Sequence, residues 1–209
     1  MTYTALKPST YTQPAGIAIF DQAVLALGRV HECSGAGQHS FAFMLARCTQ
    51  GPIIWASPRS TPLGLNPDGI RRYINPNRLI IARYARTIDG LTVIEDSLRS
   101  AAAPVVIGQF NDFPTLTQIR RLHLASTADP TGRAPVTVLL TPSQGGCPGV
   151  ETRWHMTPNG QTGLGDLCWT LRRTRARMMP PASWDIIWKG DQMKGGHIRA
   201  TPQQNRIAS

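Results

Sequence analysis

Short apolar runs recur along the first two thirds of the chain and alternate with segments of helical periodicity. Strands are predicted at residues 30–33, 52–56, 79–82, 104–107 and 136–140. Three of these (Pro-Ile-Ile-Trp-Ala, Pro-Val-Val-Ile and Val-Thr-Val-Leu-Leu) are continuous or nearly so, which is typical of strands buried on both faces. Because helices join such strands by right-handed crossovers, the pattern predicts an α/β fold with a mostly parallel sheet flanked by helices.

The helices are expected between these strands. The first has an apolar face at i, i+3, i+4 and i+7, made by Phe41, Met44, Leu45 and Cys48. A short helix is expected at residues 69–73. Thr87 and Thr115 are expected to be the N-caps of two further helices.

The pattern changes after the Ser-Gln-Gly-Gly segment at residues 143–146. Residues 150–156 and 167–173 alternate with period two, and Trp184, Ile186 and Trp188 continue the alternation. Such alternation indicates antiparallel strands with one solvated face.

One domain is expected at residues 16–189, and its part at residues 150–189 is the antiparallel hairpin region. Residues 1–15 are expected to form a flexible tail, and residues 190–209 a basic, disordered tail. The 209 residues are 41% hydrophobic, enough for a core. No apolar run approaches the roughly 20 residues of a membrane span, so we expect no membrane contact and a cytoplasmic, nucleoid-associated protein.

The charge is strongly positive and comes almost entirely from arginine. The net charge is +10, which favours an acidic partner, most simply nucleic acid. The lysines are Lys7, Lys189 and Lys194, so the body of the fold has no lysine for a phosphate loop, a kinase strand or a Schiff base. The four cysteines form no C-x-x-C pair, and we expect no metal site.

A glycine-rich turn, Ser-Gly-Ala-Gly at residues 34–37, follows the first of these strands. A turn between a strand and a helix can present backbone amides to phosphate. The G-x-x-x-x-G-K-[ST] motif nevertheless fails, because Ser40, Phe41 and Ala42 stand at its last three positions. We interpret Gly35, Gly37 and Ser40 as a degenerate phosphate loop that holds an anion weakly at most.

Other catalytic arrangements are also missing from the sequence. Gln109 stands after a central strand where a nucleotide-hydrolysing enzyme would place an acid, and Asp112 is expected to be a loop or capping residue. No H-E-x-x-H or G-x-S-x-G motif occurs. His31, beside Glu32, is more consistent with a hydrogen-bonded structural histidine than with a site. We therefore expect no catalytic residue and no cofactor.

Arginines and tryptophans cluster around the predicted antiparallel strands. Guanidinium groups suit phosphate, and indole rings can stack on bases. The alternative is a solvated basic hairpin whose tryptophans belong to the core. The candidate DNA- or partner-binding residues are Arg172, Arg173, Arg175, Arg177, Trp169, Trp184 and Trp188.

Residues 17–46 contain a segment with an aspartate that is expected to be helical, then a Leu-Gly-Arg turn and a strand ending in Glu-x-x-Gly, an order similar to the beginning of the RecA core. Further segments that carry a resemblance are residues 77–81, 94–100, 105–108, 116–125 (with Arg-Arg-Leu), 152–154 and 169–173. On these residues the chain resembles the ImuA family, RecA-like accessory proteins of bacterial damage-induced mutagenesis. The resemblance covers residues 17–188, and members usually carry an acid where Gln109 stands.

This resemblance implies a non-catalytic adaptor in SOS translesion synthesis. Its expected partners are an ImuB-like polymerase homologue, an error-prone DnaE-type polymerase and RecA, with DNA bound directly or through the complex. The family's partner-binding region corresponds to residues from about Val150 onward. Two alternatives stay open: a SulA-like inhibitor of the division GTPase, and a weak NTPase that uses an arginine such as Arg47 or Arg71.

Overall fold

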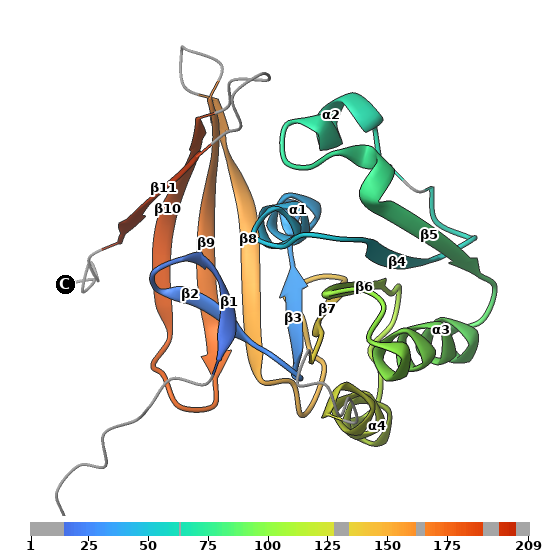
Figure 1. The fold of residues 1–209 in the computed structure, drawn as a ribbon. Coiled ribbons are helices and arrows are strands. Elements are labelled where there is room, and N and C mark those ends of the chain that lie inside the picture. Colours follow the sequence, from blue (N-terminus) through green and yellow to red (C-terminus); the bar gives the residue numbers. More distant parts are fainter. Residues whose placement is uncertain (1–14, 63, 128–133, 162–165, 190–196, 204–209) are drawn as a thin grey trace, which may run out of the picture.

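A nine-stranded mixed sheet organises the molecule, and a separate two-stranded hairpin packs beside it (Figure 1). The computed structural model describes residues 15–62, 64–127, 134–161, 166–189 and 197–203. The order of the large sheet is β11-β10-β9-β8-β3-β7-β6-β4-β5. Its strands are β3 (Val30–Ser34), β4 (Ile53–Pro58), β5 (Leu79–Tyr84), β6 (Val105–Gln109), β7 (Val136–Thr141), β8 (Thr152–Gln161), β9 (Leu167–Ala176), β10 (Ala182–Lys189) and β11 (His197–Pro202).

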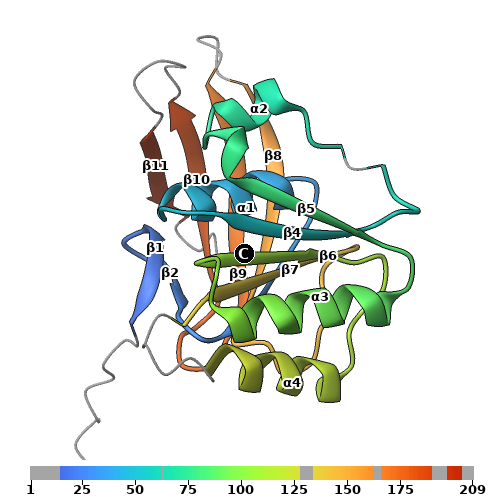
Figure 2. The same cartoon turned by 45° about the vertical axis from the view of Figure 1, so that its right-hand side comes forward.

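The half of the sheet from β8 to β5 is parallel and is covered by helices on both faces over its central strands. Helix α1 lies on one face, and α3 and α4 run side by side on the other (Figure 2). The α/β class and the mostly parallel sheet predicted from the apolar runs are therefore confirmed. The helical elements are α1 (Gln38–Arg47), α2 (Pro67–Arg71), the 3-10 turn η1 (Pro76–Arg78), α3 (Thr87–Ser100) and α4 (Leu116–Thr127).

The predicted helix caps differ in outcome. At α4 the side chain of Gln118 accepts a hydrogen bond from the amide of Thr115 (2.7 Å), and the Gln118 amide donates to Thr115 Oγ1 (3.4 Å). This is the reciprocal capping expected of Thr115. At α3, Thr87 is instead the first helical residue, and its hydroxyl donates to Asp112 (3.0 Å), which ties α3 to the loop after β6.

The antiparallel half consists of β8 to β11, and β8 also pairs in parallel with β3. The expected disordered tail is wrong over His197–Pro202, because these residues pair with β10 from Lys189 back to Trp184. The domain therefore extends beyond residue 189. The expected disorder at residues 190–196 and 204–209, and the expected tail at residues 1–14, lie outside the described residues.

The segment that resembles the aspartate-bearing helix of RecA forms a β-hairpin instead. Strands β1 (Gly16–Phe20) and β2 (Ala23–Ala26) pair antiparallel around a turn at Asp21. Apolar side chains hold the hairpin in place: Ile19 and Leu25 enter the core, and the ring of Phe20 meets Trp184 edge-on at 5.6 Å. The hairpin thereby covers one face of the antiparallel strands.

Among the described residues, no helix is long and apolar enough to cross a membrane.

Candidate functional site

The glycine turn packs directly against β8. The Gly37 amide donates to the carbonyl oxygen of Met156 (2.8 Å), so it is not free to bind an anion. Gly35 has φ +89°, and a Cβ there would overlap the same carbonyl. The Ser34 hydroxyl, at the end of β3, hydrogen-bonds His155 Nδ1 (3.0 Å). The turn is thus a packing element that joins β3 to its neighbour β8.

Ser40 does not complete a phosphate loop with the two glycines. It lies on α1 and lines a cavity of about 410 Å³ together with Tyr73 and Leu167, and neither Gly35 nor Gly37 lines that cavity. The structure therefore does not bring the three predicted loop residues around one space.

Gln109, at the end of β6, is built into the core rather than presented to a ligand. Its side-chain oxygen accepts a hydrogen bond from the indole of Trp55 (3.4 Å), and its main-chain oxygen accepts one from the Tyr84 hydroxyl. Gln109 itself is 8% exposed. A neutral amide held in this way cannot accept a proton from an attacking water, and it cannot replace a metal-binding carboxylate.

Glu32 is a fully buried carboxylate whose acceptor positions are occupied. It pairs with the Arg153 guanidinium and accepts hydrogen bonds from Thr141 Oγ1 (2.8 Å) and the amides of Gly146 (2.7 Å) and Cys147 (3.0 Å). Burial raises the pKa of Glu32, but the Arg153 ion pair and these donors outweigh it and hold the pKa below its usual value. Glu32 therefore joins β3, β7, β8 and the turn before β8.

His31 behaves as a structural histidine, as its sequence context indicates. Its Nδ1 lies 2.7 Å from Thr152 Oγ1 and its Nε2 lies 3.1 Å from the carbonyl oxygen of Ala26. The Trp154 indole donates to the same Thr152 hydroxyl (2.7 Å), which leaves that hydroxyl to donate to His31. Burial lowers the pKa of His31 to about 4, so the ring is neutral at pH 7.

The C-terminal candidates separate onto the two faces of the antiparallel strands. Trp169, Trp184 and Trp188 are all buried in the core, where they cannot stack on a base. Arg173 is also buried, at 6% exposed, between the rings of Trp154 and Trp184. Its guanidinium donates to the carbonyl oxygens of Pro180 and Gln22. The prediction of Arg173 and the three tryptophans as binding residues is therefore wrong.

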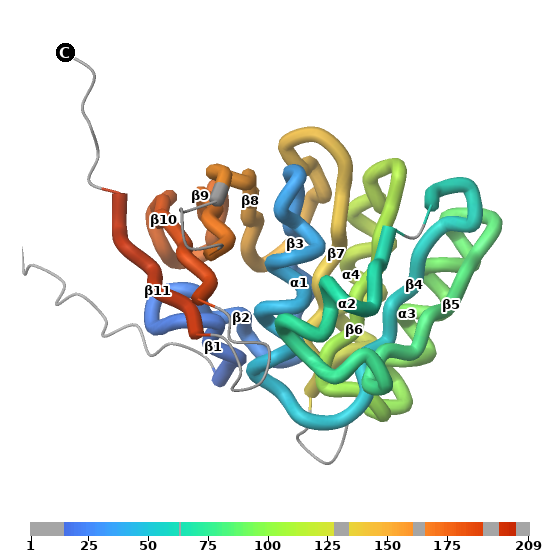
Figure 3. The backbone as a smooth tube through the Cα atoms, turned by 90° about the horizontal axis from the view of Figure 1, so that it is seen from above, coloured from blue at the N-terminus to red at the C-terminus, as the bar shows by residue number. Residues whose placement is uncertain are grey.

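The opposite face of β8–β11, here called the outer face, carries the remaining candidates. Arg172 and Arg175 are exposed on it. The alternation of side chains along β10 and β11 places Lys189 and Arg199 on the same face, together with the carboxylate of Asp185. In Figure 3 the hairpin and α1 lie on the inner side of these strands, and no described helix lies on the outer side.

Arg175 and Arg177 reach a cavity of about 390 Å³, here called the basic cleft. Arg29 before β3 and Arg120 on α4 line the same cavity, and its one carboxylate is Glu151. The Arg29 Nε atom lies 3.9 Å from Glu151 Oε2. The sequence did not group these residues, because the chain separates them by up to 148 positions.

His123 completes the basic cleft. Its Nε2 lies 3.1 Å from the carbonyl oxygen of Gly149. Burial is the main cause that lowers the pKa of His123; Arg29 and Arg177 act in the same direction, while the Gly149 hydrogen bond and Glu151 oppose it. An anion entering the cleft would stabilise the charged ring.

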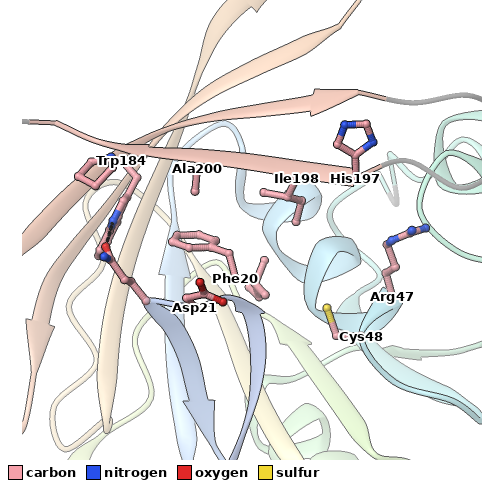
Figure 4. A pocket seen from close by; sticks show the side chains of 11 residues that line it. Phe20, Asp21, Arg47, Cys48, Trp184, His197, Ile198 and Ala200 are labelled. Carbon is pink, nitrogen blue, oxygen red and sulfur yellow. Dashed lines mark hydrogen bonds between the residues drawn. The ribbon is translucent and has the colours of Figure 1, made fainter.

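A third cavity, of about 490 Å³, lies between the β1–β2 turn, the end of α1 and β11 (Figure 4). Phe20, Ile198 and Ala200 give it apolar walls, whereas Asp21 and Arg47 bring opposite charges. Arg47 ends α1 here, about 15 Å along the helix axis from the glycine turn. It cannot serve as the phosphate-binding arginine of an unconventional NTPase at that turn.

No group of three or more histidine, cysteine, aspartate or glutamate side chains within the described ranges is placed to hold a metal ion.

No model of a known protein family matches the chain, and no curated protein sequence matches it. The fold and its sites therefore define the class: an α/β domain with a mixed sheet, a closed glycine turn and a basic cleft at the opposite end of β3.

Proposed function

We propose that the chain is a non-catalytic, RecA-like adaptor in SOS damage-induced mutagenesis, similar to the ImuA family. The observation that carries this proposal is the closed glycine turn. It lies between a strand and a helix, where a nucleotide-binding domain presents amides to phosphate, yet the Gly37 amide is bonded to Met156 of β8. Gln109, at the end of β6, is held by a hydrogen bond from the Trp55 indole.

The strand order supports the RecA-like part of the proposal. Two strands, β7 and β6, separate β3 from β4, although β4 follows β3 along the chain. On its other side, β3 pairs in parallel with β8, and the antiparallel strands follow. We infer from this order, and from the strand-turn-helix at the end of β3, that the glycine turn corresponds to a phosphate loop.

The adaptor role rests on the resemblance, and the outer face offers a surface for it. We propose an ImuB-like polymerase homologue and an error-prone DnaE-type polymerase as partners, with RecA as a further one. Residues beyond Val150 include the uncovered strands β9–β11, which present Arg172 and Arg199 without a covering helix in the described chain.

Affinity purification of the tagged protein from DNA-damaged, nuclease-treated cells tests the proposal. The two polymerase-type partners should be recovered, and Arg172→Glu with Arg199→Glu should reduce their recovery. Arg59→Glu with Arg71→Glu is the matched control, since both are exposed and neither lies on the outer face. Recovery of the division GTPase in place of the polymerases would support the SulA-like alternative and contradict the proposal.

Truncation after Ser143 is unsuitable for this test. It removes β8, whose Trp154 and Met156 are fully buried beside β3, and it removes Arg153, the ionic partner of Glu32. Loss of partners by such a truncation would report unfolding. Point substitutions at exposed side chains avoid that ambiguity.

The weak-NTPase alternative has its own measurement. Binding and turnover of magnesium ATP at millimolar concentration should both be undetectable. Ser40→Ala is the informative variant for any residual activity, because Ser40 is partly exposed, whereas a Gly35 substitution would disrupt packing on β8. Turnover that Ser40→Ala abolishes would contradict a non-catalytic role.

A further inference from the structure

The basic cleft concentrates positive charge that the protein itself does not neutralise. Arg29, Arg120, Arg175 and Arg177 line it against the single carboxylate of Glu151. Of these arginines, only Arg29 is within ion-pair distance of a carboxylate among the described residues, at 3.9 Å. Like charges held around one cavity repel each other, so an arrangement of this kind is favourable when an anion fills it.

The cleft is assembled from four separate parts of the chain. Arg29 lies just before β3, Arg120 on α4, Glu151 just before β8, and Arg175 and Arg177 at the end of β9. Each of these residues lies within a helix or strand or one residue from the end of one, so the sheet and α4 hold their backbones in place. Planar guanidinium groups suit the paired oxygens of phosphate, and His123, which also lines the cleft, adds a positive charge when protonated.

The positive charge continues from the cleft onto the outer face. Arg175 belongs to both, and Arg172 is the next arginine along β9 on the outer face. Arg199 lies two strands away on β11 and level with Cys168, so about 10 Å across the sheet and four residues along it separate Arg199 from Arg172, with Asp185 on the strand between them. An isolated phosphate would occupy only the cleft. The phosphates of a nucleic-acid strand can contact both the cleft and the outer face, because the strand carries one charge per roughly 3.4 Å of duplex.

We propose that the basic cleft binds the phosphodiester backbone of nucleic acid, with the strand running from the cleft onto the outer face. This inference does not depend on the proposed adaptor function, since it concerns the purified protein alone. Of the binding residues predicted from the sequence, this site includes Arg172, Arg175 and Arg177 but not the buried Arg173 or the tryptophans. Arg29, Arg120 and His123 are new members of the site.

The test is fluorescence anisotropy of labelled single-stranded and duplex oligonucleotides with the full-length protein over a series of salt concentrations. Arg120→Gln/Arg175→Gln/Arg177→Gln should weaken binding about 100-fold and flatten the logarithmic salt dependence by about 2 to 3. The control Arg59→Gln/Arg71→Gln/Arg72→Gln also removes three positive charges, but from exposed positions outside the cleft. It should change the affinity for the oligonucleotide less than about threefold.

Glu151→Gln provides a change in the opposite direction, which misfolding cannot imitate. It removes the carboxylate of the cleft and should tighten oligonucleotide binding about threefold or more. Absence of binding by the parent protein would overturn the proposal, as would equal weakening by both triple variants or no tightening by Glu151→Gln. Full displacement of the oligonucleotide by millimolar inorganic phosphate at constant ionic strength would reduce the cleft to a simple anion site and also overturn it.

Discussion

The two ends of β3 differ in how the protein uses them. At the carboxyl end, the glycine-rich sequence of the turn is typical of a phosphate-binding site, yet the Gly37 amide donates a hydrogen bond to the Met156 carbonyl oxygen. At the amino end, the residues beside Arg29 have no recognisable motif, yet arginines surround a cavity of about 390 Å³. The comparison teaches that a glycine-rich turn between a strand and a helix can serve packing alone, while the unneutralised charge lies on a surface without a sequence motif, where we propose that nucleic acid binds.

Substitution at Gly35 has the largest expected effect on this comparison. Gly35→Ala should lower the free energy of unfolding by about 3 to 4 kcal/mol, because φ is +89° and the new Cβ would overlap the Met156 carbonyl. Gly160→Ala is the matched control: φ is again +89°, but no atom of the described residues lies within 4 Å of the added Cβ. It should cost about 1 to 2 kcal/mol. Equal losses in urea unfolding would show that the turn does not pack as described.

His31, within β3, should make stability depend on acid pH. Its pKa is about 4 in the folded state and 6.5 in the unfolded state, so the unfolded chain binds the proton first as pH falls. Stability is therefore complete above pH 6.5 and falls by about 3 kcal/mol between pH 6.5 and 4. His31→Gln, measured by denaturant unfolding across this range, should lose that part of the slope. An unchanged slope would show that folding does not lower the pKa of His31.

Arg173 and Arg172 sharpen the distinction between the inner and outer faces. Arg173→Ala should destabilise the protein by about 2 to 3 kcal/mol, since it leaves the carbonyls of Pro180 and Gln22 without this donor and removes contacts with two indole rings. Arg172→Ala should change stability by less than about 0.5 kcal/mol. Thermal unfolding of the two neighbouring variants, followed by circular dichroism, measures both. Similar melting temperatures would contradict the assignment of faces.

Protonation of His123 provides the smallest expected effect. Its pKa is lowered in the free protein, mainly by burial, so a bound phosphate should raise it and affinity for the oligonucleotide should increase as pH falls. Glu151, Arg29, Arg120, Arg175 and Arg177 line the same cleft. His123→Gln should retain binding at pH 8 and lose most of the increase in affinity that follows as the pH falls below 6.5. A pH profile that His123→Gln leaves intact would exclude this histidine from the cleft's binding role.

Local patterns predicted the parallel half of the fold well. Continuous apolar runs became β4, β6 and β7, and the spacing of Phe41, Met44 and Leu45 became the buried face of α1. The β1–β2 hairpin could not be predicted from periodicity, because its strands, Gly-Ile-Ala-Ile-Phe and Ala-Val-Leu-Ala, are short and apolar throughout, a pattern that does not separate strand from helix. Strand β11 was missed because a short polar segment gains its order from pairing with β10.

The candidate site was harder to predict, because it depends on contacts between distant residues. Period-two alternation on β9 could have placed Arg173 beside Trp169 and away from Arg172. No sequence signal brings Arg29 and Arg120 to Arg177; the sheet order does so. The cluster of arginines in the sequence therefore pointed to the end of β9 that reaches the basic cleft, but it combined residues from both faces of that strand.

An amide-resolved NMR titration of the intact protein, first with magnesium ATP and then with a short single-stranded oligonucleotide, tests the contrast between the two ends of β3 most directly. The account predicts no specific shifts at Gly35, Gly37 and Ser40 with ATP. It predicts saturable shifts at Arg120, Glu151 and Arg177 with the oligonucleotide. Saturable shifts at the glycine turn with ATP, together with an unperturbed cleft, would contradict it.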